Sequence, residues 1–505
     1  MLASLSLVIL AAASTPCEML DAMSTPQISI KAASAPAGPF VAPAPPAAPG
    51  AAAPAAGRGG AAAAPALPAH CRVRLVLKPT TDSNINAELW MPAQNWNGKF
   101  MAVGNGGFGG SIKGYGEMQN ALRLGYATAG NDTGHSAADG PNGMFALGHP
   151  EKIVDFAYRA MHETTATSKK LIDRYYGNAP QFSYYKGCST GGRQGAMAAQ
   201  RYPEDYDGII AGALANRHIQ MHTAGVYRNI QLALHPEARI SEAKAATVNQ
   251  AVMNKCDTLK EGFLNNPRAC SFDFSTLACK GADSDSCLTP AQLKTVEQFY
   301  GGVKNSKGEL IFSGQALGNP LPALQGPAAG AAPGGGFDTV RIWGFQNADY
   351  DWKTFDLDRD MPVINSKVGF VDAVEPDLSK FKARGGKLLL YAGWGDTGIT
   401  PENTVLLLRQ HQSEDGPQPG RLGAALHGAG DGPLPRRRRP AYLRPDRHDG
   451  SVAREGRGAH RNHGVQPAVG PVAAALRLPA VREVQGNRQL QGRDELVLRR
   501  PLKKE

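Results

Sequence analysis

The segment from Tyr184 to Gly192 carries the pattern Gly-x-Ser-x-Gly, with Ser189 at its centre. This spacing is typical of a nucleophile elbow, where a strand turns sharply into a helix and presents a serine hydroxyl at the top of a sheet. Glycines flank the serine because side chains at those positions would collide in so tight a turn. We therefore expect a strand over Phe182–Lys186 and a helix from the elbow to about Tyr202.

The rest of the chain alternates between strand and helix patterns. Strands are predicted at Cys71–Leu77, Phe100–Val103, Ile209–Gly212 and Lys387–Tyr391, and apolar residues recur at helical spacing over residues 151–175. Alternation of this kind predicts a mostly parallel α/β sheet flanked by helices.

Two stretches interrupt this alternation. Residues 33–69 are almost all Ala, Pro and Gly, a composition that favours a flexible low-complexity insertion. Residues 217–384 follow no regular period and contain four cysteines, so we predict an inserted cap or lid domain there. The sheet domain would then comprise residues 70–216 and 385–410.

The N-terminus and the cysteines indicate export. Residues 5–14 are apolar and end in small residues, which predicts a signal peptide over residues 1–16, although no positive charge precedes them; the alternative is a short apolar strand or helix. Seven cysteines suit an oxidising compartment, so a secreted or periplasmic location is expected. The sequence has no Cys-x-x-Cys pair that would favour a zinc site, and no run of 18 apolar residues that would predict a membrane span.

The net charge of +10 is concentrated at one end of the chain. Residues 411–505 hold 18 Lys and Arg against 10 Asp and Glu, whereas the preceding residues are nearly neutral. The run Arg436–Arg439 could be read as a site for nucleic acid or anionic lipid. No interleaved aromatic residues support that reading, and we expect no nucleic-acid partner.

Ser189 is a weak nucleophile unless a histidine takes its proton and an acid orients that histidine. In hydrolases with this elbow, the acid and then the histidine follow the serine along the chain. Asp396 comes just after the late apolar strand, so we assign it as the acid. The alternative is a loop aspartate that caps a turn.

An oxyanion formed at Ser189 needs two backbone N–H donors. In this prediction Thr190, directly after the serine, supplies one, and Gly106 or Gly107 in the glycine-rich loop 104–110 supplies the other. Such a loop can also cradle a phosphate, but no Lys-Ser or Lys-Thr pair follows it, which disfavours a nucleotide site.

These motifs resemble the tannase/feruloyl esterase family of serine esterases. The matching runs are Trp96–Phe100, Gly104–Phe108, Asn131–His135, Tyr184–Gly195 and Arg201–Gly212, within a resemblance that covers about residues 71–410. The resemblance implies an α/β-hydrolase fold with a cap, hydrolysis of small aromatic acid esters through an acyl-serine intermediate, and no cofactor for the chemistry. It leaves open which aromatic acid is recognised and what the oligomeric state is.

In that family a disulfide joins the cysteine before the serine to a cysteine directly after the catalytic histidine, and Cys188 matches its first half. No cysteine follows Cys287, and the last 95 residues contain no His-Cys pair. We expect the bridges Cys17–Cys71, Cys256–Cys270 and Cys279–Cys287, which leave Cys188 unpaired. The catalytic histidine is therefore predicted to be missing from this chain.

Residues 411–505 have an unusual composition for a folded segment, with 16 Arg, 2 Lys and one aromatic residue, Tyr442. Such a segment buries too little apolar surface to offset its ordering entropy, so we predict a disordered tail. Codons for His427–Arg439 read one base later permit Met-Val-Pro-Gly-Met-Gly-His-Cys, which contains the missing motif. Our hypothesis is a reading-frame slip near residues 410–413 that replaces the C-terminus of the family.

Other histidines are poor substitutes for the missing base. His135 precedes Ser189 in the chain, against the usual order, and we assign it a structural or pocket role. The surroundings of the tail histidines cannot fix an imidazole within hydrogen-bond reach; these are His427, His448, His460 and His463. The alternative function is therefore a catalytically inactive protein of the same fold that binds aromatic esters.

The loop between Cys256 and Cys270 resembles a family loop that binds structural calcium. Asp257, Glu261 and the backbone carbonyl of Phe263 are its candidate ligands, although the acidic run here is short. Calcium takes six to eight oxygen ligands, so the alternative is a loop without an ion.

Overall fold

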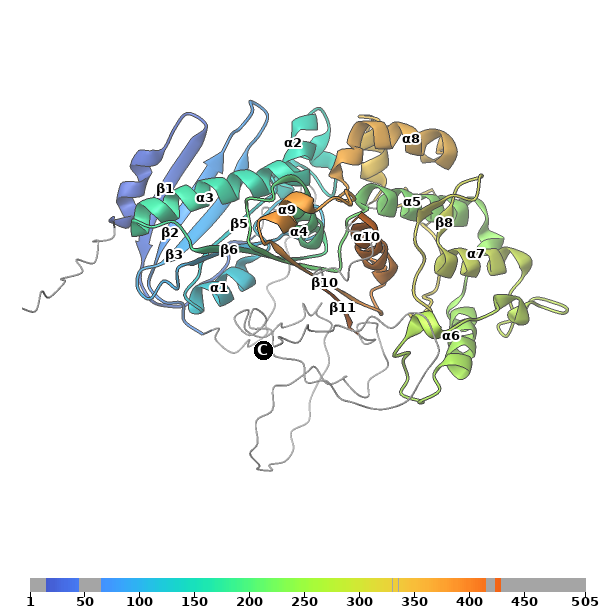
Figure 1. The fold of residues 1–505 in the computed structure, drawn as a ribbon. Coiled ribbons are helices and arrows are strands. Elements are labelled where there is room, and N and C mark those ends of the chain that lie inside the picture. Colours follow the sequence, from blue (N-terminus) through green and yellow to red (C-terminus); the bar gives the residue numbers. More distant parts are fainter. Residues whose placement is uncertain (1–14, 45–64, 329, 335, 415–422, 428–505) are drawn as a thin grey trace, which may run out of the picture. The chain divides into compact units, whose positions relative to one another are not determined.

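One nine-stranded sheet organises the fold (Figure 1). Its order is β1-β2-β3-β5-β4-β6-β7-β10-β11. The strands are β1 (Ile28–Ala35), β2 (His70–Leu77), β3 (Ile85–Pro92), β4 (Lys99–Val103), β5 (Ala127–Asn131), β6 (Phe182–Cys188), β7 (Gly208–Gly212), β10 (Lys387–Gly393) and β11 (Gly423–His427). This computed structural model describes residues 15–44, 65–328, 330–334, 336–414 and 423–427, all of which fall in one compact unit, Met1–Gly456.

The sheet is mostly parallel, which confirms the α/β class predicted from the sequence. Among the described strands, β5, β4, β6, β7, β10 and β11 pair in parallel. Strands β1, β2 and β3 form an antiparallel edge that joins β5. Because parallel strands end at the same edge, the loops that follow β4, β6 and β10 meet there.

Helices cover both faces of this sheet. They are α1 (Tyr115–Arg123), α3 (Ala160–Tyr176), α4 (Thr190–Arg201) and α10 (Pro401–Glu414), and the short α2 (Pro150–Val154) precedes α3 in the chain. Figure 1 shows α3 and α4 on one side and α1 on the other. Successive side chains of β6 follow this division, because the Tyr185 hydroxyl donates to Gly191 O in α4 at 2.8 Å, whereas Lys186 pairs with Glu117 in α1 at 2.8 Å.

The helix predicted over residues 151–175 is interrupted by a π-helical turn at Asp155–Arg159, which separates α2 from α3. The fully buried Arg193 of α4 explains the interruption. Its guanidinium donates to the carbonyls of Phe156 and Ala157 in this turn, at 3.0 and 2.9 Å, and stacks on the Phe156 ring. A π turn leaves carbonyls available to such a partner.

The predicted low-complexity insertion at 33–69 is shorter than expected. Residues 33–35 belong to β1, where their backbone pairs with Arg72, Cys71 and His70 of β2. Phe40 packs its ring against Trp90 at 4.6 Å, so the segment after β1 also belongs to the fold. Residues 45–64 lie outside the described residues, as do residues 1–14 of the predicted signal peptide.

A long excursion separates β7 from β10. It contains α5 (His218–Leu234), α6 (Glu242–Cys256), α7 (Pro290–Gly301), α8 (Leu357–Val368), α9 (Ser379–Ala383) and the hairpin of β8 (Val303–Lys304) and β9 (Leu310–Phe312). Its apolar side chains form clusters distinct from the core of the sheet, one around Ile219 and Trp343 and another around Val248 and Val296. None of the described helices is both long and apolar enough to cross a membrane.

The predicted disordered tail at 411–505 begins too early. Helix α10 continues to Glu414, and His411 is buried with its Nδ1 2.7 Å from Pro376 O. Strand β11 then pairs in parallel with β10, placing His427 in register with Gly393. The segment Gly-Ala-Ala-Leu-His contains no proline or other residue that prevents strand pairing. The prediction missed this strand because it was based on the average composition of residues 411–505. The other residues of that prediction lie outside the described part.

Candidate active site

Ser189 stands at the junction of β6 and α4 with a strained backbone. Its φ is +62° and its ψ is −122°. Residues other than glycine rarely adopt this backbone conformation. The Ser189 N–H donates to Gly212 O at 3.0 Å, and the Ser189 carbonyl accepts from the Arg193 N–H at 3.0 Å. The serine is thus held between the first turn of α4 and the end of β7, in the geometry of a nucleophile elbow.

The glycines around Ser189 are required by space. A Cβ at Gly187 would meet the backbone of Gly191 at 2.5 Å, and one at Gly191 would meet Asn105 O at 2.9 Å. The Gly191 N–H also donates to Asn105 O at 2.8 Å. The elbow and the loop after β4 therefore touch through backbone atoms, as the glycine spacing predicted.

This contact brings the glycine-rich loop to the N-terminus of α4. The Thr190 hydroxyl donates to Gly107 O at 2.6 Å, and Lys113 Nζ donates to Gly106 O at 2.9 Å. The Gly106 N–H donates to the Asn105 side chain at 2.9 Å, so its proton is already engaged. Of the two glycines named from the sequence, Gly107 is therefore the better candidate for an oxyanion donor beside the Thr190 N–H.

Asp396 lies in the turn after β10, two strands from Ser189. Its Oδ1 accepts the N–H groups of Gly398 at 2.9 Å and Ile399 at 2.8 Å, which fixes the carboxylate. Burial raises the pKa of the Cys188 thiol, and the negative charge of Asp396 raises it further. Asp396 thus follows β10 as the sequence analysis expected, and its charge acts on the thiol beside Ser189; its role as the catalytic acid stays a prediction.

The histidines that precede Asp396 in the chain pair or pack with groups other than Ser189 in the described part. None of the histidines from His70 to His235 forms a hydrogen bond with Ser189 in the described part. His135 stacks on Phe145 at 3.5 Å, and burial lowers its pKa to about 3, which suits a structural role. His427 is placed by its backbone alone, and His448, His460 and His463 lie outside the described residues.

A buried aromatic cluster, missed from the sequence, supports the loop after β4. Phe108 packs against His218 and His222 of α5 and against Trp343, with ring centroids 5.2 to 5.8 Å apart. Burial lowers the pKa of His222 to about 4 and that of His218 well below its usual range, so both rings are neutral. The separation of these residues in the chain left no local pattern that could have revealed the cluster.

The structure joins Cys17 to Cys71, Cys256 to Cys270 and Cys279 to Cys287, the pairs expected from the sequence. Cys188 is the free cysteine. The residue is exposed, but burial of its sulfur raises the pKa of the thiol, an effect that the Tyr391 hydroxyl opposes in part by hydrogen bonding to the sulfur.

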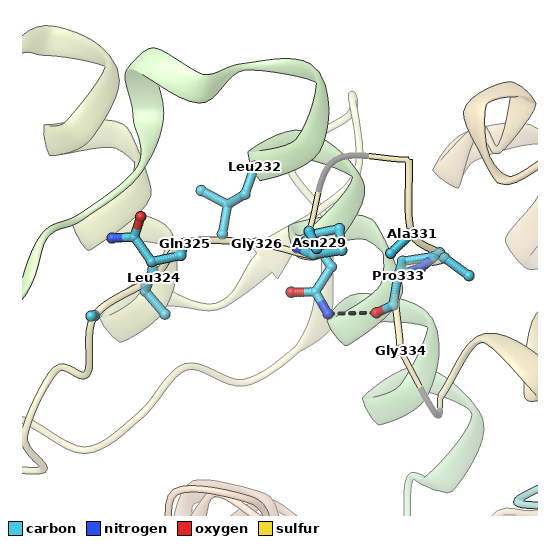
Figure 2. Close-up of a pocket in the computed structure, with 12 residues that line it drawn as sticks. Asn229, Leu232, Leu324, Gln325, Gly326, Ala331, Pro333 and Gly334 are labelled. Atoms are coloured by element: carbon cyan, nitrogen blue, oxygen red, sulfur yellow. Dashed lines mark hydrogen bonds between the residues drawn. The ribbon is translucent and has the colours of Figure 1, made fainter.

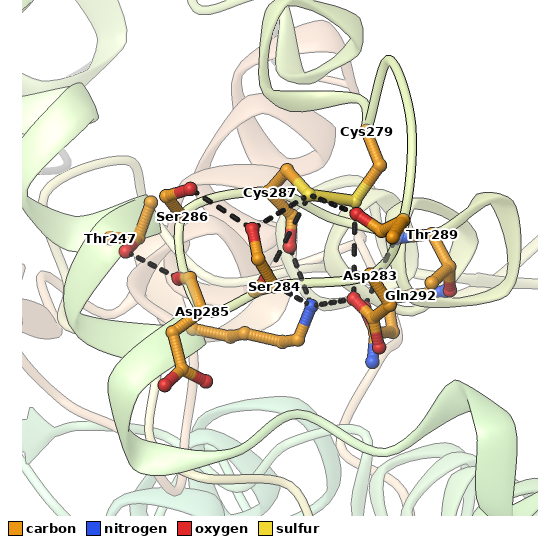
Figure 3. Close-up of a disulfide and its surroundings, with 11 residues drawn as sticks. Thr247, Cys279, Asp283, Ser284, Asp285, Ser286, Cys287, Thr289 and Gln292 are labelled. Atoms are coloured by element: carbon orange, nitrogen blue, oxygen red, sulfur yellow. Dashed lines mark hydrogen bonds and ion pairs between the residues drawn. A yellow bond between two sulfur atoms is a disulfide. The ribbon is translucent and has the colours of Figure 1, made fainter.

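The Cys279–Cys287 bridge closes a short loop that includes Asp283 and Ser284 (Figure 3). Lys244 Nζ donates to the Asp283 carboxylate at 2.5 Å and to Cys287 O at 2.6 Å. Cys279, Asp283 and Cys287 are the three candidate metal ligands that converge in the described part. The disulfide removes both thiolates, so this group does not form a metal site.

Two of the three calcium ligands proposed from the sequence form hydrogen bonds within their own loop. The Asp257 carboxylate accepts the N–H groups of Glu261 and Gly262 at 3.1 and 2.8 Å. Glu261 in turn accepts from the Asn265 amide at 2.7 Å. These bonds close the loop, and a calcium site at Asp257, Glu261 and Phe263 stays a prediction from the sequence.

A separate cavity of about 490 Å³ lies in the excursion (Figure 2). Its wall includes Leu232 and Leu324, and the Asn229 side chain spans it to donate to Pro333 O at 2.6 Å. The cavity is formed by the Gly/Pro-rich segment and does not include Ser189 or Asp396.

Comparisons with known proteins place the chain in a family. The family model described as tannase and feruloyl esterase matches residues 71–335 and 328–414. An uncharacterized esterase of Xanthomonas campestris pv. campestris is 38% identical over 386 residues, covering 72% of this chain and 67% of the relative. The probable feruloyl esterase B-1 of Aspergillus oryzae is 33% identical over 344 residues, covering 66% of this chain and 63% of that protein. The chain thus spans about two thirds of the length of these relatives.

Solved structures give the same result for the fold. The crystal structure of feruloyl esterase B from Aspergillus oryzae superposes with a TM-score of 0.70 at 28% identity, covering 82% of this chain and 81% of that chain. A tannin acyl hydrolase from Aspergillus niger, at 19% identity, shares the fold with a TM-score of 0.58 over 81% of this chain and 77% of its own. The predicted α/β-hydrolase fold is confirmed, and the chain belongs to the tannase and feruloyl esterase family.

Proposed function

We propose that this fold hydrolyses carboxylic esters of aromatic acids through an acyl-serine intermediate. The observation that carries the proposal is the strained Ser189, held against a glycine-rich loop at the start of α4. The Ser189 oxygen attacks the ester carbonyl, and the Thr190 and Gly107 N–H groups stabilise the negative charge that develops on its oxygen. Where the triad is intact, a histidine takes the Ser189 proton and gives it to the departing alcohol. Water, deprotonated by the same histidine, then releases the aromatic acid, and the proton returns to the Ser189 oxygen.

The substrate class is supported by the names of the relatives, which include feruloyl esterases and a tannin acyl hydrolase. We assign the excursion between β7 and β10 as the cap, because α5 packs His218 and His222 against Phe108 of the oxyanion loop. The three disulfides and seven cysteines support an exported protein, secreted or periplasmic.

The second part of the proposal is that this chain lacks its catalytic base. We assign Asp396, whose Oδ1 accepts the Gly398 N–H in the turn after β10, as the acid that would orient the base. Among the described histidines from His70 to His235, none bonds to Ser189. The family match ends at residue 414, just after the region where the reading frame is proposed to slip. Sequencing the coding DNA from Thr404 to the stop codon tests the slip: the idea fails if the shifted frame cannot encode a His-Cys pair.

Turnover of p-nitrophenyl benzoate tests the missing base. We expect this chain to be at least about 10³-fold slower in kcat than a version restored to the shifted frame, because a triad without its histidine retains little activity. The Ser189→Ala variant of both proteins sets the background. Equal turnover in the two proteins would refute the proposal.

One histidine of this chain serves as a control for that experiment. Strand β11 carries His427 to the carboxyl edge of the sheet, in register with Gly393 of β10. If this chain hydrolyses the ester and His427→Ala abolishes turnover, His427 acts as the base and the frame hypothesis is unnecessary for activity. We expect no difference between His427→Ala and the parent chain.

A second candidate function is an ester-binding protein without catalysis, favoured by the intact contact between the glycine-rich loop and α4 in a chain whose described histidines from His70 to His235 do not bond to Ser189. It predicts saturable binding of a methyl ester of an aromatic acid, measured by calorimetry, without labelling of Ser189 by a fluorophosphonate probe. Labelling at a rate similar to that of the frame-restored version would exclude it.

A further inference from the structure

The motif Trp96–Phe100 has no part in the proposed chemistry, yet it forms one wall of a groove. Trp96 and Asn97 precede β4, and Asn178 to Gln181 precede β6. These two strands are parallel neighbours, with Lys99 opposite Phe182. The groove therefore lies at the amino edge of the sheet, whereas Ser189 follows the carboxyl end of β6.

The groove is large and carries no charged side chain. Its volume is about 590 Å³, within the range of about 300 to 1,000 Å³ found for small-molecule sites. One indole and three carboxamide side chains are among its lining residues, which are Trp96, Asn97, Gly98, Asn178, Ala179 and Gln181.

Trp96 is a fixed aromatic platform. Its ring stacks flat on Tyr176, with centroids 4.0 Å apart and planes 4° from parallel, and its Nε1 donates to Lys99 O at 2.9 Å. The Tyr176 hydroxyl donates to Pro92 O at 2.7 Å, which fixes the second ring. Tyr176 does not line the groove, so the groove meets the part of the indole that Tyr176 leaves uncovered.

The carboxamides beside this platform can both donate and accept hydrogen bonds. Asn97 is committed to the turn, because it accepts the Lys99 N–H and donates to Leu124 O. Asn178 and Gln181 are exposed, and the Asn178 amide makes only a long contact of 3.5 Å with Tyr176 O. Their amides are therefore available to a ligand that offers hydroxyl groups.

We propose that this groove binds a neutral oligosaccharide of pyranose rings. The apolar C–H face of a pyranose stacks on the uncovered indole, as an aromatic ring with a fixed orientation allows. Its hydroxyls exchange hydrogen bonds with Asn178 and Gln181. The lining residues include no charged side chain that could pair with a charged peptide or a nucleic acid. They also include too few apolar side chains to enclose a free aromatic acid.

A role of Trp96 in folding accounts for part of these contacts. The bond from Nε1 to Lys99 O closes the turn before β4, and the stack on Tyr176 ties the turn to α3. Neither contact uses the exposed amides of Asn178 and Gln181, which lie on a different loop. Substitution of Asn178 and Gln181 can therefore test sugar binding without removing the contacts by which Trp96 stabilises the fold.

Binding can be measured on the full chain without catalysis, so its outcome is independent of the proposed function. Cellotriose and xylotriose, titrated to about 50 mM, should quench tryptophan fluorescence with a millimolar Kd for at least one sugar. The double variant Asn178→Ala, Gln181→Ala should bind about tenfold more weakly with an unchanged Tm, as expected when one or two hydrogen bonds are lost.

The control is Trp352→Phe, which removes a partly exposed tryptophan in the excursion and should leave the quenching intact. Trp96→Phe keeps an aromatic ring and should weaken binding while abolishing most of the quenching. No saturable signal with either sugar, or binding that the double variant leaves unchanged, would overturn the proposal.

Discussion

The Thr190 hydroxyl donates to the carbonyl oxygen of Gly107 at 2.6 Å, which links the first residue of α4 to the loop that follows β4. The two proposed oxyanion donors belong to these same residues. The distance between the two N–H groups is therefore set by the Thr190 side chain as well as by the backbone. A substitution at Thr190 should shift the position of Gly107.

Replacing Thr190 with valine should lower the free energy of unfolding by about 1 kcal/mol. The substitution keeps the shape of the side chain but removes its donor, a loss typical of one hydrogen bond. Urea denaturation of the full chain measures the effect. Thr190→Ser retains the hydroxyl and should stay within about 0.5 kcal/mol of the parent; equal stability of the valine variant would show that the bond contributes nothing.

Replacing Ser189 with glycine should stabilise the protein by about 1 kcal/mol. The φ of +62° costs a residue with a Cβ on the order of 1 to 3 kcal/mol, and glycine adopts it freely at some entropic cost in the unfolded chain. Ser189→Ala keeps the Cβ and should leave stability nearly unchanged. If both variants shift the midpoint of thermal unfolding equally, strain at the elbow is not the cause.

Cys188 should react slowly with alkylating reagents in the folded protein. Burial of its sulfur raises its pKa, Asp396 adds to the effect, and the thiolate is the reactive form. At pH 8, iodoacetamide should label folded Cys188 at least about tenfold more slowly than the same residue in urea. A thiol assay in urea without reductant should count one free thiol per chain; a count of three or more would contradict the disulfide pattern.

Asp372 should make stability fall as the pH rises from about 4 to 7. Burial raises the pKa of its carboxyl to about 7, so in this window the unfolded chain loses its proton while the folded chain keeps it. In Asp372→Asn the amide oxygen can still accept the Ile219 N–H, a bond of 2.9 Å in the parent. The unfolding free energy of this variant, measured relative to that of the parent, should therefore increase between pH 5 and 7.5.

The matched control for that measurement is Asp377→Asn. Asp377 is exposed and accepts the Ser379 N–H, which lowers its pKa, so it is ionised in both states above pH 5. Its variant should differ from the parent by the same amount at pH 5 and 7.5. A parallel pH dependence for both variants would mean that Asp372 does not titrate as proposed.

The elbow was predictable because its constraints are local. A strand, a sharp turn and a helix leave a short pattern of glycines around Ser189, and the predicted strand Phe182–Lys186 falls within β6. The turn that carries Asp396 was predictable because an apolar strand, β10, ends at Gly393 just before it; the role of Asp396 stays a prediction. The same logic found β4 and β10 within two residues of their ends.

The parts that sequence reasoning missed depend on distant partners. Strand β1 contains four alanine or serine residues at its end and becomes a strand only by pairing with β2, far along the chain. The π turn at Asp155–Arg159 requires the guanidinium of Arg193 from another helix. The neutral His218 and His222 are explained by the aromatic rings that bury them, and no spacing in the sequence encodes that burial.

Each of the three disulfides begins and ends on the same side of the boundary between sheet and excursion. Cys17–Cys71 ties the N-terminal segment to β2, while Cys256–Cys270 and Cys279–Cys287 close loops inside the excursion. A change in the length or sequence of the excursion therefore demands no compensating cysteine elsewhere. The excursion can thus change in sequence while the covalent link between the N-terminal segment and the sheet stays the same.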